Sequence, residues 1–233
     1  MGTLYLVRHG QASAFDDNYD RLSSLGERQA RLLGEDWRRR NLQLDRVFAG
    51  PRVRQQRTAE IACEAGGLPA PVIVPELDEM GVEPLFREHL PAVVEHHPHV
   101  GALGDSLLAA DGDAERARGF ARLFEAVLQL WVRGEVRANG VESWLEFRAR
   151  VGRALDIVRA DGRGKRIAVF TSAGPVAAAV QLALGADDDT ALSMAFRVRN
   201  SSFSQFLFAD GRFSLASFNE TPHLSDAALV TVR

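Results

Sequence analysis

Short apolar runs alternate with segments of helical periodicity along most of the chain. The β-rich runs are Thr3–Arg8, Arg46–Ala49, Val72–Val74 and Arg166–Thr171. Apolar residues recur at helical spacing between them, which predicts helices over Ser24–Arg40, Val53–Ala65 and Pro175–Leu184. This alternation predicts an α/β fold, a three-layer sandwich with a mostly parallel central sheet and helices on both faces.

A different pattern follows near the C-terminal end. Two β-rich runs flank Asp210 and Gly211 in the segment SSFSQFLFADGRFSLASFN. Asp-Gly between such runs is a strong signal for a β-hairpin, so we expect an antiparallel pair that closes the sheet. An exposed edge strand can also pair with a second copy of the chain, and the sequence therefore leaves a homodimer open.

No strand pattern is visible between about residues 80 and 140. Apolar side chains recur there at helical spacing, at Phe120, Leu123, Phe124, Val127, Leu128 and Trp131. A second series follows at Trp144, Phe147, Val151, Leu155 and Val158. We interpret residues 80–140 as a helical insertion within one domain of residues 1–233. Large apolar residues at this spacing usually form a core, so we assign these aromatic side chains to packing.

Composition narrows the classes of function. Formal net charge is −3, which gives no electrostatic case for a nucleic-acid partner. No apolar run approaches the ~20 residues of a membrane span, and MGTLYLVRHG lacks the features of a signal peptide. One cysteine, Cys63, excludes an intrachain disulfide. We therefore expect a cytoplasmic protein with no membrane partner.

Charged and polar residues cluster where the predicted strands end. In a parallel α/β sheet, ligands bind beyond the carboxyl ends of the strands. The four strand exits carry Arg8, His9, Gly10 and Gln11; Arg52, Arg54 and Arg57; Glu76, Asp78 and Glu79; and Thr171, Ser172, Ala173 and Gly174.

Together these groups fit a phosphate. Guanidinium groups pair with phosphate oxygens through two parallel hydrogen bonds. Pro175 suits the first position of a helix, whose N-terminus would offer free N–H groups. A histidine can act as the nucleophile, and a carboxylic acid can protonate the leaving oxygen. We expect a small phosphorylated substrate or inorganic phosphate as the partner, with no metal and no cofactor.

An ordered series of motifs resembles one family, the histidine phosphatase or phosphoglycerate mutase-like superfamily. LVRHGQ resembles its Arg-His-Gly signature, and RLSSLGERQA its Leu-Thr-x-x-Gly-x-x-Gln-Ala segment. AGPRVRQQRTAE resembles Ser-Pro-x-x-Arg-Ala-x-Gln-Thr-Ala, PELDEMG resembles Leu-x-Glu, and NGVESWLEFRARV resembles a Gly-Glu-Ser helix start. FTSAGPVAAAV resembles Thr-His-Gly-Gly-Pro. The resemblance covers nearly the whole chain and implies a phosphoglycerate mutase-like fold.

The resemblance also implies roles for individual residues. His9 would be the nucleophile that becomes phosphorylated, and Glu79 would donate a proton to the leaving group. Arg8 and Arg54 would clamp the phosphoryl oxygens. Gln11 and Ser23 match positions near the phosphate. These roles describe a phosphomonoester hydrolase that works through a phosphohistidine.

The chain departs from the family pattern at Gly50, where Ser is common, and at Arg57, where Gln is common. The larger departure is Ser172, which falls where the family carries a second catalytic histidine. A serine hydroxyl remains a hydrogen-bond donor to phosphate but cannot carry a positive charge. Losing one preorganised donor costs roughly 10²–10³ in rate, and a partial replacement should cost less.

Three accounts of Ser172 stay open. Ser172 and the helix N-terminus suffice for a slower phosphatase, another group replaces the imidazole, or the protein binds phosphorylated ligands with little turnover. We favour the first because the nucleophile, the arginines and the acid remain. A phosphoglycerate mutase-type phosphotransferase is a further alternative, since it would return the phosphate to a second hydroxyl. The sequence does not identify the substrate.

Three other features have structural interpretations. His223 is the natural candidate to replace the missing imidazole, but its segment resembles the ordinary C-terminus of the family, so we prefer a structural role. EHHPH suggests a metal by composition, yet Pro98 breaks the helical register and no second ligand cluster follows. Ser24 and Glu27 match a capping box, whereas Ser23 stays open between a helix cap and a phosphate contact.

Overall fold

The structure is a computed structural model, and it describes residues 1–13, 20–160 and 162–232. The chain forms two compact units. The first combines Met1–Glu79 with Arg148–Arg233, and the second is Met80–Phe147.

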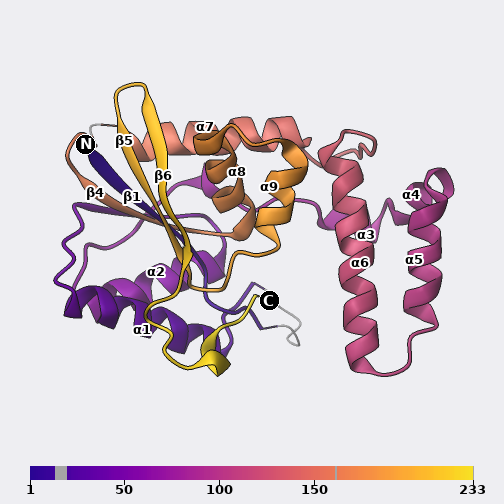
Figure 1. Cartoon of the computed structure of the whole chain (residues 1–233), viewed down its shortest axis with the longest axis horizontal. Coiled ribbons are helices and arrows are strands. Elements are labelled where there is room, and N and C mark those ends of the chain that lie inside the picture. Colours follow the sequence, from indigo (N-terminus) through magenta and orange to yellow (C-terminus); the bar gives the residue numbers. More distant parts are fainter. Residues whose placement is uncertain (14–19, 161, 233) are drawn as a thin grey trace. The chain divides into compact units, whose positions relative to one another are not determined.

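A six-stranded sheet organises the described part of the first unit (Figure 1). Its strands are β1 (Gly2–Arg8), β2 (Arg46–Ala49), β3 (Val72–Ile73), β4 (Arg166–Thr171), β5 (Phe203–Ala209) and β6 (Arg212–Glu220). The order is β3-β2-β4-β1-β5-β6; the first four strands are parallel, and β5 runs antiparallel to both of its neighbours, β1 and β6. The expected α/β fold and the antiparallel hairpin at its edge are confirmed.

The register of the central strands brings three chain segments to one edge of the sheet. Arg8 at the end of β1 pairs with Thr171 at the end of β4. The ladder continues one step further, because His9 N donates to Thr171 O at 2.9 Å. Gly50, directly after β2, donates its N–H to Phe170 O at 2.9 Å. His9, Gly50 and Ser172 therefore leave the sheet at neighbouring points.

Helices lie on both faces of this sheet (Figure 1). α1 (Ser24–Arg39) and α2 (Val53–Gly66) lie on one face, and α7 (Trp144–Arg159) and α8 (Ala173–Leu184) lie on the other. α9 (Asp188–Ala195) follows α8, and short 3₁₀ helices span Pro75–Leu77 and Ala227–Leu229.

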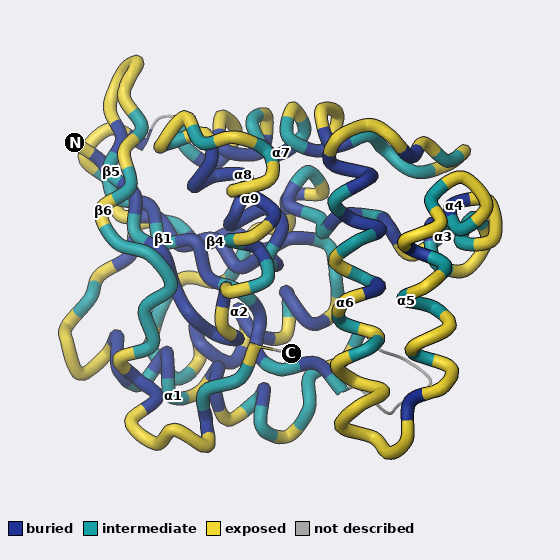
Figure 2. Tube along the Cα trace, turned by 45° about the vertical axis from the view of Figure 1, so that its right-hand side comes forward, coloured by how far each residue is buried: buried dark blue, intermediate teal, exposed yellow. Residues whose placement is uncertain are grey.

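The side chains of β1 point alternately to the two faces of the sheet and pack in the core on both sides. Val7 packs in a buried cluster with Leu33 and Trp37 of α1, and the Tyr5 ring lies 5.9 Å from that of Trp37. Successive residues of a strand face opposite ways, so the buried Leu6 points to the other face. Figure 2 shows β1 and β4 largely in the colour of buried residues. Burial on both faces of the sheet thus explains why β1 is a short apolar run.

The cap of one helix and the start of another differ from the sequence prediction. Ser23, and not Ser24, caps α1: its backbone is extended and its side chain accepts from Gly26 N at 3.0 Å. A bridge between Ala12 and Leu22 keeps the chain extended up to this point, which fixes where the helix begins. α8 begins at Ala173, so Pro175 takes its third position and not its first. Proline is tolerated there because first-turn N–H groups have no intrahelical partner.

The described residues of the second unit form helices and connecting turns, with no strand. α3 (Glu83–Arg87), α4 (Leu90–His96), α5 (Pro98–Leu108) and α6 (Asp113–Val132) precede the first residues of α7. Trp131 and Trp144 meet edge to face at 5.6 Å, and Trp131 Nε1 donates to Glu142 O. The aromatic side chains pack as expected, except that Phe120 is 49% exposed. None of the described helices combines the length and apolar character that crossing a membrane requires.

Candidate active site

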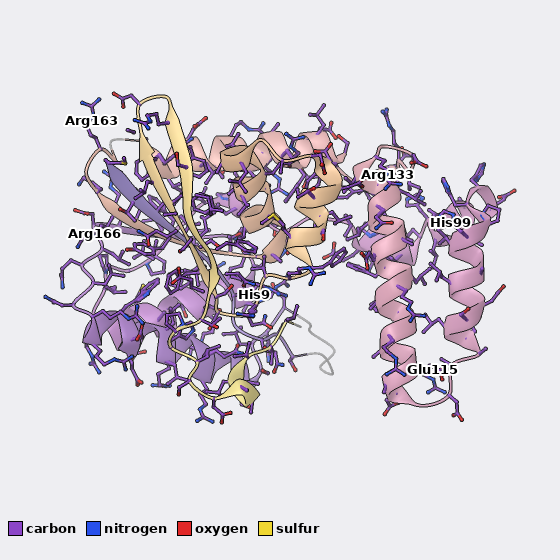
Figure 3. All side chains as sticks on the ribbon, in the orientation of Figure 1. His9, His99, Glu115, Arg133, Arg163 and Arg166 are labelled. Atoms are coloured by element: carbon purple, nitrogen blue, oxygen red, sulfur yellow. The ribbon has the colours of Figure 1, made fainter. Side chains whose placement is uncertain are left out.

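His9 follows β1 at the end of the sheet far from the β5–β6 turn (Figure 3). It is only 4% exposed, and its Nδ1 lies 2.7 Å from the carbonyl oxygen of Gly10. A carbonyl can only accept, so Nδ1 carries the ring proton and Nε2 holds the lone pair. Burial, followed by the charges of Arg8 and Arg54, lowers the pKa of His9 well below its usual value. His9 is therefore a neutral imidazole with its basic nitrogen at Nε2.

Backbone contacts fix the position of this ring. Gly10 N donates to Thr58 Oγ1 at 3.0 Å, and the His9 carbonyl accepts from Ser201 N at 3.1 Å. A Cβ on Gly10 would lie 2.4 Å from the carbonyl oxygen of Gly26, so only glycine fits after the histidine. The strand exit is thus held against α1, α2 and the segment that leads into β5.

Arg54, from the first turn of α2, lies beside the basic nitrogen of His9. Its Nε donates to His9 Nε2 at 3.2 Å, and its Nη1 pairs with Asp20 Oδ1 at 3.0 Å. Asp20 Oδ2 also accepts from Val53 N at 2.9 Å. The carboxylate of Asp20 therefore anchors both the guanidinium and the start of α2. A buried arginine needs such a partner, yet Asp20 carries no signal in the sequence that assigns it this role.

Arg8 contributes a further positive charge. Its positive charge is the second cause of the lowered pKa of His9, after burial. Its guanidinium Nη1 donates to the carbonyl oxygens of Val198 and Val232, the latter at 2.7 Å. Backbone carbonyls from two distant segments thus orient the Arg8 side chain.

Gln11 and Ser23 form a hydrogen-bonded pair next to this cluster. Ser23 Oγ donates to Gln11 Oε1 at 2.9 Å while it caps α1, and Gln11 N donates to Gln29 Oε1 at 2.8 Å. The cap function of Ser23 is therefore established, and a phosphate contact by either side chain stays a prediction.

Glu79 lies against the N-terminus of α8. Its Oε1 accepts from Gly174 N at 3.1 Å, so an N–H that we expected to face phosphate is taken by this carboxylate. Arg150 of α7 holds the segment by donating to the carbonyl oxygens of Glu76 and Asp78, both at 2.9 Å, and of Glu79 at 3.2 Å. Arg150 could not be predicted from the sequence, because its partners are backbone carbonyls more than seventy positions away.

Ser172 is buried at the N-cap position of α8, without a capping hydrogen bond from its side chain. Its Oγ accepts from Gln55 Nε2 at 2.8 Å. Gln55 is also buried and follows Arg54 on α2, so one helix turn serves both His9 and Ser172. Gln55 was not among the residues predicted from sequence, although the related segment quoted above has alanine after the arginine.

The remaining candidates take no part in these hydrogen bonds. Arg57 is exposed and pairs with Glu27 and Glu60, in keeping with a solvated helix charge. The rings of His97 and His99 meet at 6.0 Å. Across the described ranges, no group of three His, Cys, Asp or Glu residues is arranged to hold a metal ion.

His223 is buried behind the site, where its Nε2 lies 2.7 Å from Ser201 Oγ. Ser201 is also the residue whose N–H binds the carbonyl of His9. This arrangement supports a structural role for His223, which contacts Ser201 and so helps to hold the segment where β1 ends.

Burial of His223 predicts a loss of stability in acid. Desolvation lowers the pKa of His223 to about 4, outweighing the carboxylate of Asp36, which raises it. The unfolded chain binds this proton near pH ~6.5, so the free energy of unfolding should fall as the pH drops from there toward ~4. We expect the loss between pH ~7.5 and ~4.5 to be on the order of 2–3 kcal/mol smaller in a His223→Gln variant. Urea unfolding at both pH values measures it, and equal losses in the two proteins would contradict the prediction.

Comparison with known proteins gives one family. The sequence profile of the histidine phosphatase superfamily (branch 1) matches residues 4–105 and 110–221. A comparison with curated proteins gives no match.

Solved structures match over nearly the full chain. The α-ribazole phosphatase from Shigella flexneri is 20% identical with a TM-score of 0.63, over 94% of this chain and 96% of that one. The phosphoglycerate mutase from Bacillus anthracis str. Sterne is 17% identical with a TM-score of 0.64, over 96% and 95%. A mutant phosphoserine phosphatase from Entamoeba histolytica, solved with phosphoserine, is 18% identical with a TM-score of 0.62, over 96% and 100%. At these identities the likeness establishes the shared fold alone.

Proposed function

The chain belongs to the histidine phosphatase superfamily, and from this premise we propose that it hydrolyses phosphomonoesters through a phosphohistidine at His9. The observation that carries the proposal is the contact between a neutral, buried imidazole and a buried guanidinium, with His9 Nε2 3.2 Å from Arg54 Nε. A nucleophile for phosphorus needs a lone pair, which here accepts the hydrogen bond of Arg54, beside positive charge that can receive the phosphoryl oxygens.

In the first step, the lone pair of His9 Nε2 forms a bond to phosphorus and the bond from phosphorus to the ester oxygen breaks. The departing oxygen takes a proton from the carboxylic acid of Glu79. The imidazole becomes positively charged, and its Nδ1–H bond to the Gly10 carbonyl, 2.7 Å long in the structure, stabilises that charge.

Positive charge and hydrogen-bond donors act on the phosphoryl oxygens. Arg54 already lies beside Nε2, so its guanidinium reaches oxygens of a group bound there. Arg8 supplies a second charge near the ring, and Ser172 supplies a hydroxyl. Little covalent assistance is needed for phosphoryl transfer, so this positioning and charge provide most of the rate.

In the second step, water gives a proton to the Glu79 carboxylate while its oxygen bonds to phosphorus. The bond between phosphorus and Nε2 breaks, and its electron pair returns to the nitrogen. Inorganic phosphate leaves, and His9 and Glu79 regain their starting protonation states. Neither step requires a metal or an organic cofactor.

We infer that the substrate is a small phosphorylated metabolite. Similar folds carry an α-ribazole phosphatase, a phosphoserine phosphatase and a phosphoglycerate mutase, whose names all denote small phosphorylated compounds. We propose hydrolysis over return of the phosphate to a second hydroxyl.

A second candidate is a protein that binds phosphorylated ligands with little turnover. Ser172 favours it, because a neutral hydroxyl stands where the family commonly has a histidine.

Turnover of a generic aryl phosphate separates the two candidates. We expect the wild-type protein to release phosphate and, after rapid quenching, to carry an acid-labile phosphoryl adduct on the peptide that contains His9. Mass analysis of that peptide detects the adduct. Binding of inorganic phosphate by calorimetry, with neither release nor adduct, would replace the hydrolase by the binding protein.

A further inference from the structure

The amide of Gln55 has only one orientation that satisfies its neighbours. Gln55 Oε1 lies 3.0 Å from Arg52 N, and Gln55 Nε2 lies 2.8 Å from Ser172 Oγ. A backbone N–H can only donate, so the atom that faces Arg52 must be the amide oxygen. The amide nitrogen therefore faces Ser172, and exchanging the two atoms would set two donors against each other.

This orientation determines the direction of the Ser172 hydroxyl. The amide nitrogen of Gln55 can only donate, so Ser172 Oγ accepts from it. The proton of Ser172 then points elsewhere, and Oγ makes no other hydrogen bond within the described parts of the chain. Ser172 comes one position beyond the paired residues Arg8 and Thr171, as His9 does on the neighbouring strand. Ser172 thus leaves the sheet beside the proposed nucleophile.

Gly50 makes room for the amide. A Cβ at this position would lie 2.2 Å from Gln55 Oε1 and 2.8 Å from the carbonyl oxygen of Leu77. Both distances are far below van der Waals contact, so a side chain at residue 50 would displace the amide. Gly50, Gln55 and Ser172 therefore act as one unit.

We propose that Gln55 is a positioning residue that orients the Ser172 hydroxyl as a hydrogen-bond donor to the phosphoryl group on His9. The inference rests on the proposed function of the same site. It explains how a neutral serine serves a position where an imidazole is common, because a hydroxyl fixed in advance costs no reorganisation when charge develops. Gln55 itself does not touch the phosphoryl group.

A double-mutant cycle between Gln55→Glu and Ser172→Ala tests the proposal. A glutamate still accepts from Arg52 N, but its second oxygen can only accept, so the Ser172 proton turns toward it and away from the phosphoryl group. We expect the Gln55→Glu change to lower kcat ~3- to 10-fold more in the Ser172 protein than in the Ser172→Ala protein, the value of one hydrogen bond. KM should move much less, because the contact acts on charge that develops in the transition state.

Gln56→Glu is the matched control, because it places the same charge one position along α2, where Gln56 Nε2 donates to Pro51 O. Its effect on kcat should be the same in the wild-type and Ser172→Ala backgrounds. Equal losses for Gln55→Glu in both backgrounds would mean a charge effect and would overturn the proposal. Should Gln55→Glu fail to fold, Gln55→Met replaces it in the cycle, with a smaller coupling expected and additive effects again contrary.

Measurements on the wild-type protein distinguish a failure of the role of Gln55 from a failure of the proposed function. If it forms the phosphoryl adduct while the cycle is additive, only the role of Gln55 is wrong. If it neither binds inorganic phosphate nor forms the adduct, the proposed function fails, and the role of Gln55 fails with it.

Discussion

Replacing His9 with alanine should abolish the phosphoryl adduct and lower kcat/KM for an aryl phosphate at least ~10³-fold, because the covalent intermediate forms on this imidazole. The substitution removes the lone pair that lies against Arg54 Nε. Rapid-quench trapping and steady-state rates measure the two effects. The affinity for inorganic phosphate should change far less, since the arginines remain.

His96→Ala provides the control for this experiment. His96 is exposed on α4 and makes a local hydrogen bond to Ala92 O, so its loss should leave the rate and the adduct unchanged. An adduct that persists in the His9→Ala protein would place the nucleophile elsewhere and would remove the main support for the proposed mechanism.

Replacing Arg54 with methionine should have the second-largest effect. Methionine preserves much of the buried volume but removes the charge beside Nε2, and losing a preorganised donor to the transition state costs ~10²–10³ in kcat/KM. The pKa of His9 should also rise, because the Arg54 charge is one cause of its depression. We therefore expect the acid limb of the pH profile of kcat/KM to move to higher pH.

Arg57→Met is the matched control, one turn along the same helix. Arg57 is exposed and its ion pairs with Glu27 and Glu60 are 3.5 and 3.4 Å long, so activity should be nearly unchanged. Asp20 loses a partner in the Arg54 variant, so the unfolding midpoint is measured for both proteins. Equal activity losses in the two variants would indicate a general charge effect and would contradict the clamp.

The sheet could be predicted from the sequence because strands that are buried on both faces appear as local apolar runs. β2 and β4 have the predicted bounds, and the Asp-Gly turn joins β5 and β6 as expected. The starts of α1 and α2 were predicted correctly, but the residue that caps α1 was not. Ser23 caps α1 because a bridge between Ala12 and Leu22 sets the end of the extended segment, and such a contact leaves no local signal.

Part of the site could likewise be predicted from the sequence, and part could not. His9 and Arg54 each follow a predicted strand closely, so strand order alone suggested that they meet. Gln55 and Ser172 are 117 positions apart, and their contact depends on the absence of a side chain at Gly50. The hydrogen bonds from Arg150 to backbone carbonyls also could not be predicted from the sequence, since any residue can provide a carbonyl.

The tight space around Gly50 couples two positions of the chain. A side chain at position 50 would displace the Gln55 amide, because the added carbon and the amide oxygen would occupy the same volume. The effects of substitutions at positions 50 and 55 should therefore be non-additive, since residues that share a contact do not contribute independently.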